Sequence, residues 1–197
     1  MQTFTHIFKD EVSVPAYRWT NPDGSEGGIV AESATIDPTA IISPSAAISP
    51  GAIIGSDARI GSHVRIGECV NIGYRVDIDN YTQIESGAII YSGSEIGSYV
   101  VVGRNVILGS DVILGYSAEI GSGSIIGSRA IIGEDAYIGK DVGVCNSVVV
   151  GRGANISDGA IIGSWARIGD SARIGNAARI GSYIKIEEAA CIGINVR

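Results

Sequence analysis

Every sixth residue from Val30 to Ile192 is aliphatic, and this regularity constrains the fold more than any other feature of the chain. The stretch "IGDSARIGNAARIGS" at 168–182 shows the pattern. Of 28 consecutive positions, 22 are Ile, four are Val and two are Leu. The residue two places before each of them is small or slender, Ile184 being the bulky exception, and the residue after is usually Gly.

A period of six excludes an amphipathic helix, whose apolar stripe recurs near every 3.6 residues. It suits a short strand with inward side chains two residues apart, followed by a turn that glycine eases where φ is positive. Three such sides close a coil of about 18 residues, and stacked coils bring residues 18 apart together. The sequence therefore predicts an all-β fold. It is a parallel β-helix of about nine triangular coils over residues 30–197, without inserted loops, preceded by a capping segment over residues 1–29.

The hexapeptides "IGSDAR", "IGSHVR" and "IGSRAI" resemble those of the hexapeptide-repeat superfamily. The resemblance covers residues 30–196 and implies a left-handed β-helix. The superfamily contains acyltransferases, γ-class carbonic anhydrases and non-catalytic members. The resemblance also implies a homotrimer with sites between the subunits.

The net charge and the N-terminal sequence limit the classes of partner that we expect for this protein. The net charge is −7 and the pI about 4.8, which argues against nucleic acid because phosphate binding needs a basic face. The N-terminal residues lack an apolar signal core, and no apolar run is long enough to span a membrane. We therefore expect a cytoplasmic protein with no membrane and no nucleic-acid partner. Three widely spaced cysteines indicate no disulfide framework.

Two histidines, His6 and His63, limit the chemistry. A γ-carbonic-anhydrase site needs three histidines around zinc, and Cys69 stands on a different corner from His63, so we expect no metal site. Acyl transfer needs a general base, most often histidine. His63 is thus the candidate catalytic residue, with a coenzyme A thioester as donor if the protein is an acyltransferase; otherwise no cofactor is indicated. The alternative is that His63 is a solvated turn residue.

The repeat is least regular where Asp79, Glu85 and Tyr91 replace the usual glycine. Stacking at intervals of about 18 residues gathers titratable and aromatic residues around one corner of the third to fifth coils. We predict a ligand-binding cluster there, consisting of His63, Asp77, Asp79, Asn80, Tyr81, Glu95 and Tyr99. The alternative is that these residues decorate a solvent-exposed corner.

Outward-pointing strand residues form two further sets. Exposed apolar residues on consecutive coils mark an association surface, and we predict an oligomer interface of Ile89, Ile107 and Ile125 on one face and Ile113, Ile131 and Val149 on the next. Basic residues circle the last full turn, namely Arg167, Arg173, Arg179 and Lys185. They either capture an anionic ligand or form a charge belt that prevents edge aggregation.

The unbroken register lacks the loops that usually carry catalytic groups. The sequence therefore favours a trimeric scaffold, or a binder of a small anionic molecule at subunit clefts, with catalysis doubtful. An acyltransferase that uses His63 is the first alternative, and a γ-carbonic-anhydrase-like protein is the second. Open β-helix ends present unpaired strand groups, so we also expect trimers to associate end to end.

Overall fold

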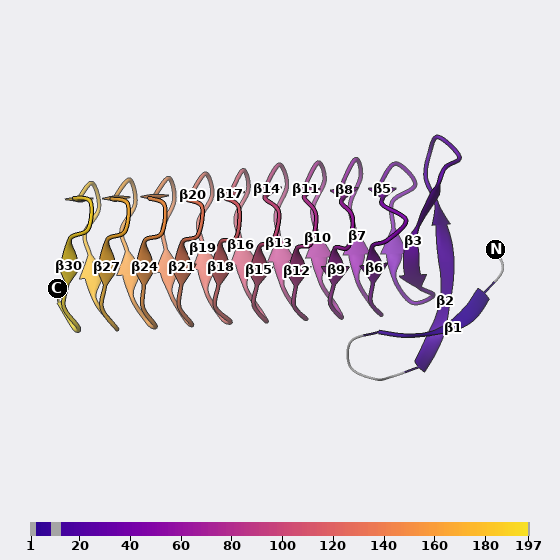
Figure 1. Ribbon diagram of the computed structural model, residues 1–197, viewed down its shortest axis with the longest axis horizontal. Coiled ribbons are helices and arrows are strands. Elements are labelled where there is room, and N and C mark those ends of the chain that lie inside the picture. The colour runs from indigo at the N-terminus through magenta and orange to yellow at the C-terminus, as the bar shows by residue number, and fades with distance from the viewer. Residues whose placement is uncertain (1–2, 9–12, 197) are drawn as a thin grey trace.

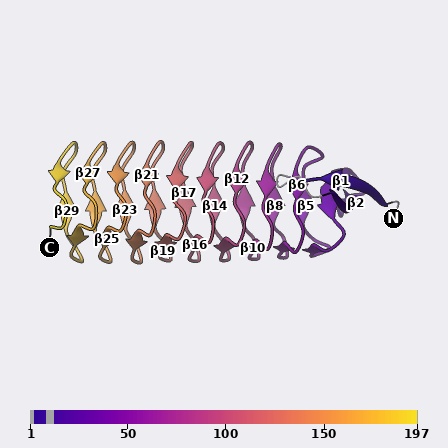
Figure 2. The same cartoon turned by 90° about the horizontal axis from the view of Figure 1, so that it is seen from below.

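The computed structural model describes residues 3–8 and 13–196. Their regular structure is entirely β-strand, with no helix among them. Parallel strands stack into a three-sided solenoid of about nine turns, so the predicted fold class is confirmed. Figures 1 and 2 show the coils in one straight column, with an antiparallel hairpin beyond the first coil. Because no described residue lies in a helix, no described helix could cross a membrane.

Three sheets form the faces of the prism. Sheet A consists of β1 (Thr3–Ile7), β2 (Ser13–Thr20), β3 (Glu26–Ala31), β6 (Ala47–Ile48), β9 (Arg65–Ile66), β12 (Gln83–Ile84), β15 (Val101–Val102), β18 (Glu119–Ile120), β21 (Tyr137–Ile138), β24 (Asn155–Ile156), β27 (Arg173–Ile174) and β30 (Cys191–Ile192). Sheet B consists of β4 (Thr35–Ile36), β7 (Ile53–Ile54), β10 (Asn71–Ile72), β13 (Ile89–Ile90), β16 (Ile107–Leu108), β19 (Ile125–Ile126), β22 (Gly143–Val144), β25 (Ile161–Ile162) and β28 (Arg179–Ile180). Sheet C consists of β5 (Ile41–Ile42), β8 (Arg59–Ile60), β11 (Asp77–Ile78), β14 (Glu95–Ile96), β17 (Ile113–Leu114), β20 (Ile131–Ile132), β23 (Val149–Val150), β26 (Arg167–Ile168) and β29 (Lys185–Ile186).

The core is a set of aliphatic stacks. Ile78, for example, pairs with Ile60 on one side and Ile96 on the other, so the register step is 18 residues as expected. The slender inward position also accepts hydroxyl side chains. Thr82 is fully buried, and its Oγ1 donates to the Gly97 carbonyl at 2.8 Å, which satisfies its polar atom inside an apolar core.

The turns explain the glycine that follows most core residues. A Cβ added at Gly121 would lie 2.5 Å from the carbonyl carbon and oxygen of Gly139, so successive coils approach too closely there for a side chain. Two residues later the backbone is left-handed, with φ of 75° at Gly123 and 57° at His63. The turns keep the six-residue register from Val30 to Val196, and no inserted loop interrupts this described stretch.

The hairpin of β1 and β2 extends sheet A and covers the first coil. Trp19 is buried, and its Nε1 donates to the Ala40 carbonyl at 3.2 Å. The Asn21 amide pairs with Ile42 as a neighbouring strand would: Oδ1 accepts from its N–H at 2.8 Å, and Nδ2 donates to its carbonyl at 3.2 Å. The cap therefore satisfies the open edge of sheet C, which begins with β5. Phe4, on the outer strand β1, stays 39% exposed.

Candidate functional site

The corner between sheets C and A carries a column of rings. His63, Tyr81 and Tyr99 each have a left-handed backbone, with φ of 57°, 59° and 61°. The His63 and Tyr81 ring centroids are 4.8 Å apart with planes 18° apart, and those of Tyr81 and Tyr99 are 4.9 Å and 9° apart. Tyr116 joins at 5.3 Å from Tyr99 with a 57° tilt. We call these four residues the corner ladder. The stacked rings cover one another's faces. Tyr81 and Tyr99 therefore expose their ring edges and polar atoms.

Asn80 stands beside the corner ladder but has a structural role. Its Oδ1 accepts a hydrogen bond from the Ser62 N–H at 2.7 Å, one coil away. Asn146, Asp158 and Asp170 accept from the preceding coil in the same way. The side chain predicted as a ligand contact is thus engaged in joining coils.

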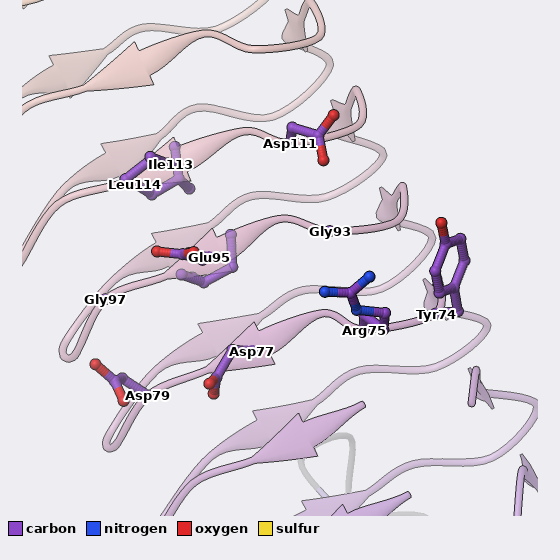
Figure 3. A pocket seen from close by; sticks show the side chains of 11 residues that line it. Tyr74, Arg75, Asp77, Asp79, Gly93, Glu95, Gly97, Asp111, Ile113 and Leu114 are labelled. Carbon is purple, nitrogen blue, oxygen red and sulfur yellow. The ribbon is translucent and has the colours of Figure 1, made fainter. Parts of the chain in front are cut away.

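The three carboxylates of the predicted cluster lie on the sheet C side of the corner. Asp77, Asp79 and Glu95 line a groove with a volume of about 440 Å³, together with Tyr74, Arg75 and Asp111. Figure 3 shows Asp77 and Asp79 on one coil and Glu95 on the next. Asp77 and Glu95 are register partners in β11 and β14, so two acidic side chains stand directly side by side.

Asp77 is the residue of this groove whose pKa is raised. Burial raises the pKa of its carboxyl, the neighbouring Asp79 carboxylate raises it further, and Arg59 opposes the shift. A carboxyl with a raised pKa can hold or donate a proton where an ordinary aspartate cannot. Among the described residues, no group of three or more His, Cys, Asp or Glu side chains could hold a metal ion.

His63 belongs to the other side of the corner. It lines a cavity of about 290 Å³ on sheet A with Arg65, Tyr81 and Gln83. It also lines a larger cavity of about 480 Å³ beneath the hairpin, where His6 and Arg18 are found as well. The predicted cluster is therefore divided by the corner, with carboxylates on sheet C and His63 and Tyr81 on sheet A. Sequence reasoning missed His6 and Arg18, because no repeat pattern relates them to His63.

The outward apolar residues form continuous surfaces. Ile107 pairs with Ile89 and Ile125 on sheet B, and Ile131 pairs with Ile113 and Val149 on sheet C. We call these six residues the apolar patch. Ile125, the most exposed of them, has 54% of its surface accessible. The two halves lie on adjoining faces, and the sheet C half is displaced by about one coil toward the C-terminus, from β17 to β23 against β13 to β19.

The basic residues near the C-terminal end do not converge. Arg167 and Lys185 are neighbours on sheet C, whereas Arg173 lies on sheet A and Arg179 on sheet B. Lys185 Nζ also lies 2.8 Å from Glu187 Oε1. The ring of charge is present, but its members lie on three different faces of the solenoid.

Known structures share this architecture. LpxA from Acinetobacter baumannii superimposes with a TM-score of 0.66 at 21% sequence identity, over 84% of this chain and 67% of that one. The chain has the hexapeptide-repeat fold. A family model described as the GMPPB C-terminal domain matches residues 30–116 of this chain, which is less than half of it. No curated protein sequence matches it.

A second solved structure combines the fold with ligands. GDP-perosamine N-acetyl transferase from Caulobacter crescentus, a histidine-to-alanine variant in complex with CoA and GDP-perosamine, has a TM-score of 0.55 at 22% identity. The match covers 56% of this chain and 52% of the transferase, so it spans about half of that enzyme. At these identities the likeness establishes the fold, and the activity has to be argued from this chain's own residues.

Proposed function

We propose that this hexapeptide-repeat protein is an acyltransferase that moves an acyl group from a coenzyme A thioester to a hydroxyl or amine of a small acceptor. The observation that carries the proposal is the position of His63. It is the histidine of the repeat, its ring is fixed by Tyr81, and it lies at two adjoining cavities on sheet A. The fold shared with GDP-perosamine N-acetyl transferase, which is solved with CoA bound, supports the same reading.

His63 would act as the general base. The thioester supplies an activated acyl carbon. A neutral His63 imidazole accepts the proton of the acceptor O–H or N–H as the new acyl bond forms, and returns a proton to the departing sulfur as the C–S bond breaks. Stacking on Tyr81 restricts rotation of the imidazole, so the ring is oriented before the acceptor arrives. The open cavity edge beside Gln83 and Arg65 leaves room for the acceptor.

Mass spectrometry of acylated products tests this proposal. The protein is incubated with acetyl and longer acyl thioesters and a panel of sugar nucleotides and amino sugars. This readout is preferable to a thiol reagent because Cys69, Cys145 and Cys191 are exposed and would react. We expect His63→Gln to lower kcat/KM about 100-fold or more. Asp135→Asn, on the same corner column and also in a left-handed turn, is the matched control and should keep full activity. Equal turnover by the His63 variant and the wild type would refute the assignment.

A second candidate function is binding without catalysis, by a scaffold or a carrier of a small anion. The unbroken six-residue register of Val30–Val196 favours it, because no loop inserted within this stretch brings a further group to His63. Retained affinity for a thioester with no product over the whole acceptor panel would support this second function and exclude the first.

The proposal includes a trimer. The apolar patch covers two adjoining faces, and a threefold axis parallel to the solenoid would bury one chain's patch against its neighbours. The six aliphatic side chains are partly exposed, and burying their remaining apolar surface would help to offset the cost of association. The mass in solution tests the trimer directly.

A further inference from the structure

The cavity beneath the hairpin, which we call the hairpin cavity, differs in charge from the rest of the molecule. The chain has a net charge of −7, yet the hairpin cavity is lined by two arginines and both histidines. No Asp or Glu is among the described residues that line it. The polar and basic members are His6, Arg18, Ser45, Ser49, His63 and Arg65. An anion would therefore meet hydrogen-bond donors from several directions.

Small side chains create this space. Along the corner column, Ser45 precedes His63, and along the outward column of sheet A, Ala47 lies between Ile29 and Arg65. Ser45 and Ala47 are short, so they leave a space on the outer surface of their coil. The longer side chains of His63 and Arg65 border this space from the next coil. The hairpin borders the cavity with Ile7 and Phe8.

The basic groups are held in place. Arg18 Nη1 donates to the Pro44 carbonyl at 2.8 Å, and its Nε lies 3.7 Å from Glu26 Oε1. A guanidinium has five N–H donors, so this anchoring leaves others for a ligand. The His6 ring packs edge-on against Phe8 at 4.6 Å, and His63 stacks on Tyr81.

Arg65 is the member best placed to receive an anion. It stands on the outward face of β9, between Ala47 and Gln83, and the described residues give it no ion pair. Glu68 and Glu85 line a smaller adjoining cavity of about 30 Å³ that Phe8, Ser49 and Arg65 also line, so Arg65 stands at the boundary between the basic hairpin cavity and this acidic space.

We propose that the hairpin cavity binds the phosphate group of a small phosphorylated molecule. Arginine forks match phosphate oxygens with charge-assisted hydrogen bonds, and the N–H group of a neutral imidazole can donate a further hydrogen bond to them. The apolar lining of Ile7, Phe8, Ile29 and Pro44 would receive a hydrocarbon or ring portion of the same molecule. This inference goes beyond the proposed function, because binding of phosphate here requires no acyl transfer.

Calorimetric titration with phenyl phosphate tests the site, since this probe has both a phosphate and an apolar ring. We expect binding by the wild type and an affinity loss of about tenfold or more in Arg65→Gln, because a charge-assisted contact is removed. Arg59→Gln is the matched control: Arg59 is an outward arginine of the preceding strand β8, on sheet C, and its variant should bind like the wild type. Benzyl alcohol, which lacks the phosphate, should not bind.

Two further titrations identify the source of the phosphate. CoA carries a phosphate monoester that dephospho-CoA lacks. If CoA binds more tightly than dephospho-CoA and the difference disappears in Arg65→Gln, the hairpin cavity serves the thioester donor. If the two bind alike while phenyl phosphate still depends on Arg65, the cavity serves a separate phosphorylated ligand. Absence of phenyl phosphate binding, or equal binding by the wild type and Arg65→Gln, would overturn the inference. Phosphate binding without acyl transfer would overturn only the proposed function.

Discussion

The His63 imidazole lies nearly parallel to the Tyr81 ring, with centroids 4.8 Å apart. The two residues are 18 positions apart, and each lies in a left-handed turn of its own coil, so the solenoid itself sets the spacing between the rings. Tyr81 also stacks on Tyr99 on its other side. One face of His63 is therefore covered, and its remaining surface borders the cavities that Arg65 also lines. A regular repeat thus yields one oriented, accessible imidazole.

Removing Tyr81 tests how much the corner ladder stabilises the fold. Each aromatic pair contributes about 0.5–1.5 kcal/mol beyond burial, so Tyr81→Ala should lower the free energy of unfolding by about 1–3 kcal/mol through its two stacked neighbours. Tyr183→Ala is the matched control, because Tyr183 has a similar φ of 62° and no ring contact among the described residues. Chemical denaturation followed by circular dichroism measures both. Equal losses in the two variants would mean that stacking contributes nothing.

Asp77 should make stability depend on pH in a recognisable direction. Its folded-state pKa is raised, mainly by burial, so its contribution to stability is present below the unfolded pKa, about 3.9 for Asp, and is lost as pH rises through the folded pKa. Asp77→Asn should therefore gain stability relative to the wild type as pH rises from acid to neutral. Thermal unfolding across that range measures the difference.

Asp37 provides a control of opposite sign for that experiment. The Thr39 hydroxyl and N–H donate to its carboxylate at 2.6 and 2.9 Å and lower its pKa. Its contribution is therefore present above the unfolded pKa and lost as pH falls through the folded pKa. Asp37→Asn should lose stability relative to the wild type as pH rises. Parallel pH profiles for the two variants would contradict at least one of the two assignments.

Gly121 and Gly143 differ in the space that an added methyl group would find. At Gly121 a new Cβ would meet backbone atoms of Gly139 at 2.5 Å, whereas at Gly143 the nearest atom would be Ile161 Cγ1 at 3.9 Å. Gly121→Ala should lower the free energy of unfolding by about 1–3 kcal/mol, because backbone cannot move aside without shifting a coil. Gly143→Ala should be neutral or raise it by about 0.5–1 kcal/mol. Denaturant titration distinguishes them, and a tolerated Gly121 variant would show that the coils can separate.

The period of six is sufficient to predict the three sheets, their register and the columns that produce the corner ladder and the apolar patch. It also places Asp77 and Glu95 on the strand before the His63 corner, but it does not reveal that they and His63 line different cavities. Nor could it place His6 and Arg18. Their position depends on antiparallel pairing of β1, β2 and β3, outside the repeat, where no periodic signal fixes the register.

The apolar patch predicts which single charge will dissociate the proposed trimer. Ile125→Asp places a carboxylate on sheet B beside Ile107, and burying it between subunits would cost several kcal/mol. Ile53→Asp is the matched control: Ile53 is also outward on sheet B and 47% exposed, but its neighbours are Thr35 and Asn71. Native mass spectrometry should find three chains for the wild type and Ile53→Asp, and one chain for Ile125→Asp. A trimer that survives Ile125→Asp would show that this patch is not the interface, and a wild-type monomer would remove the trimer altogether.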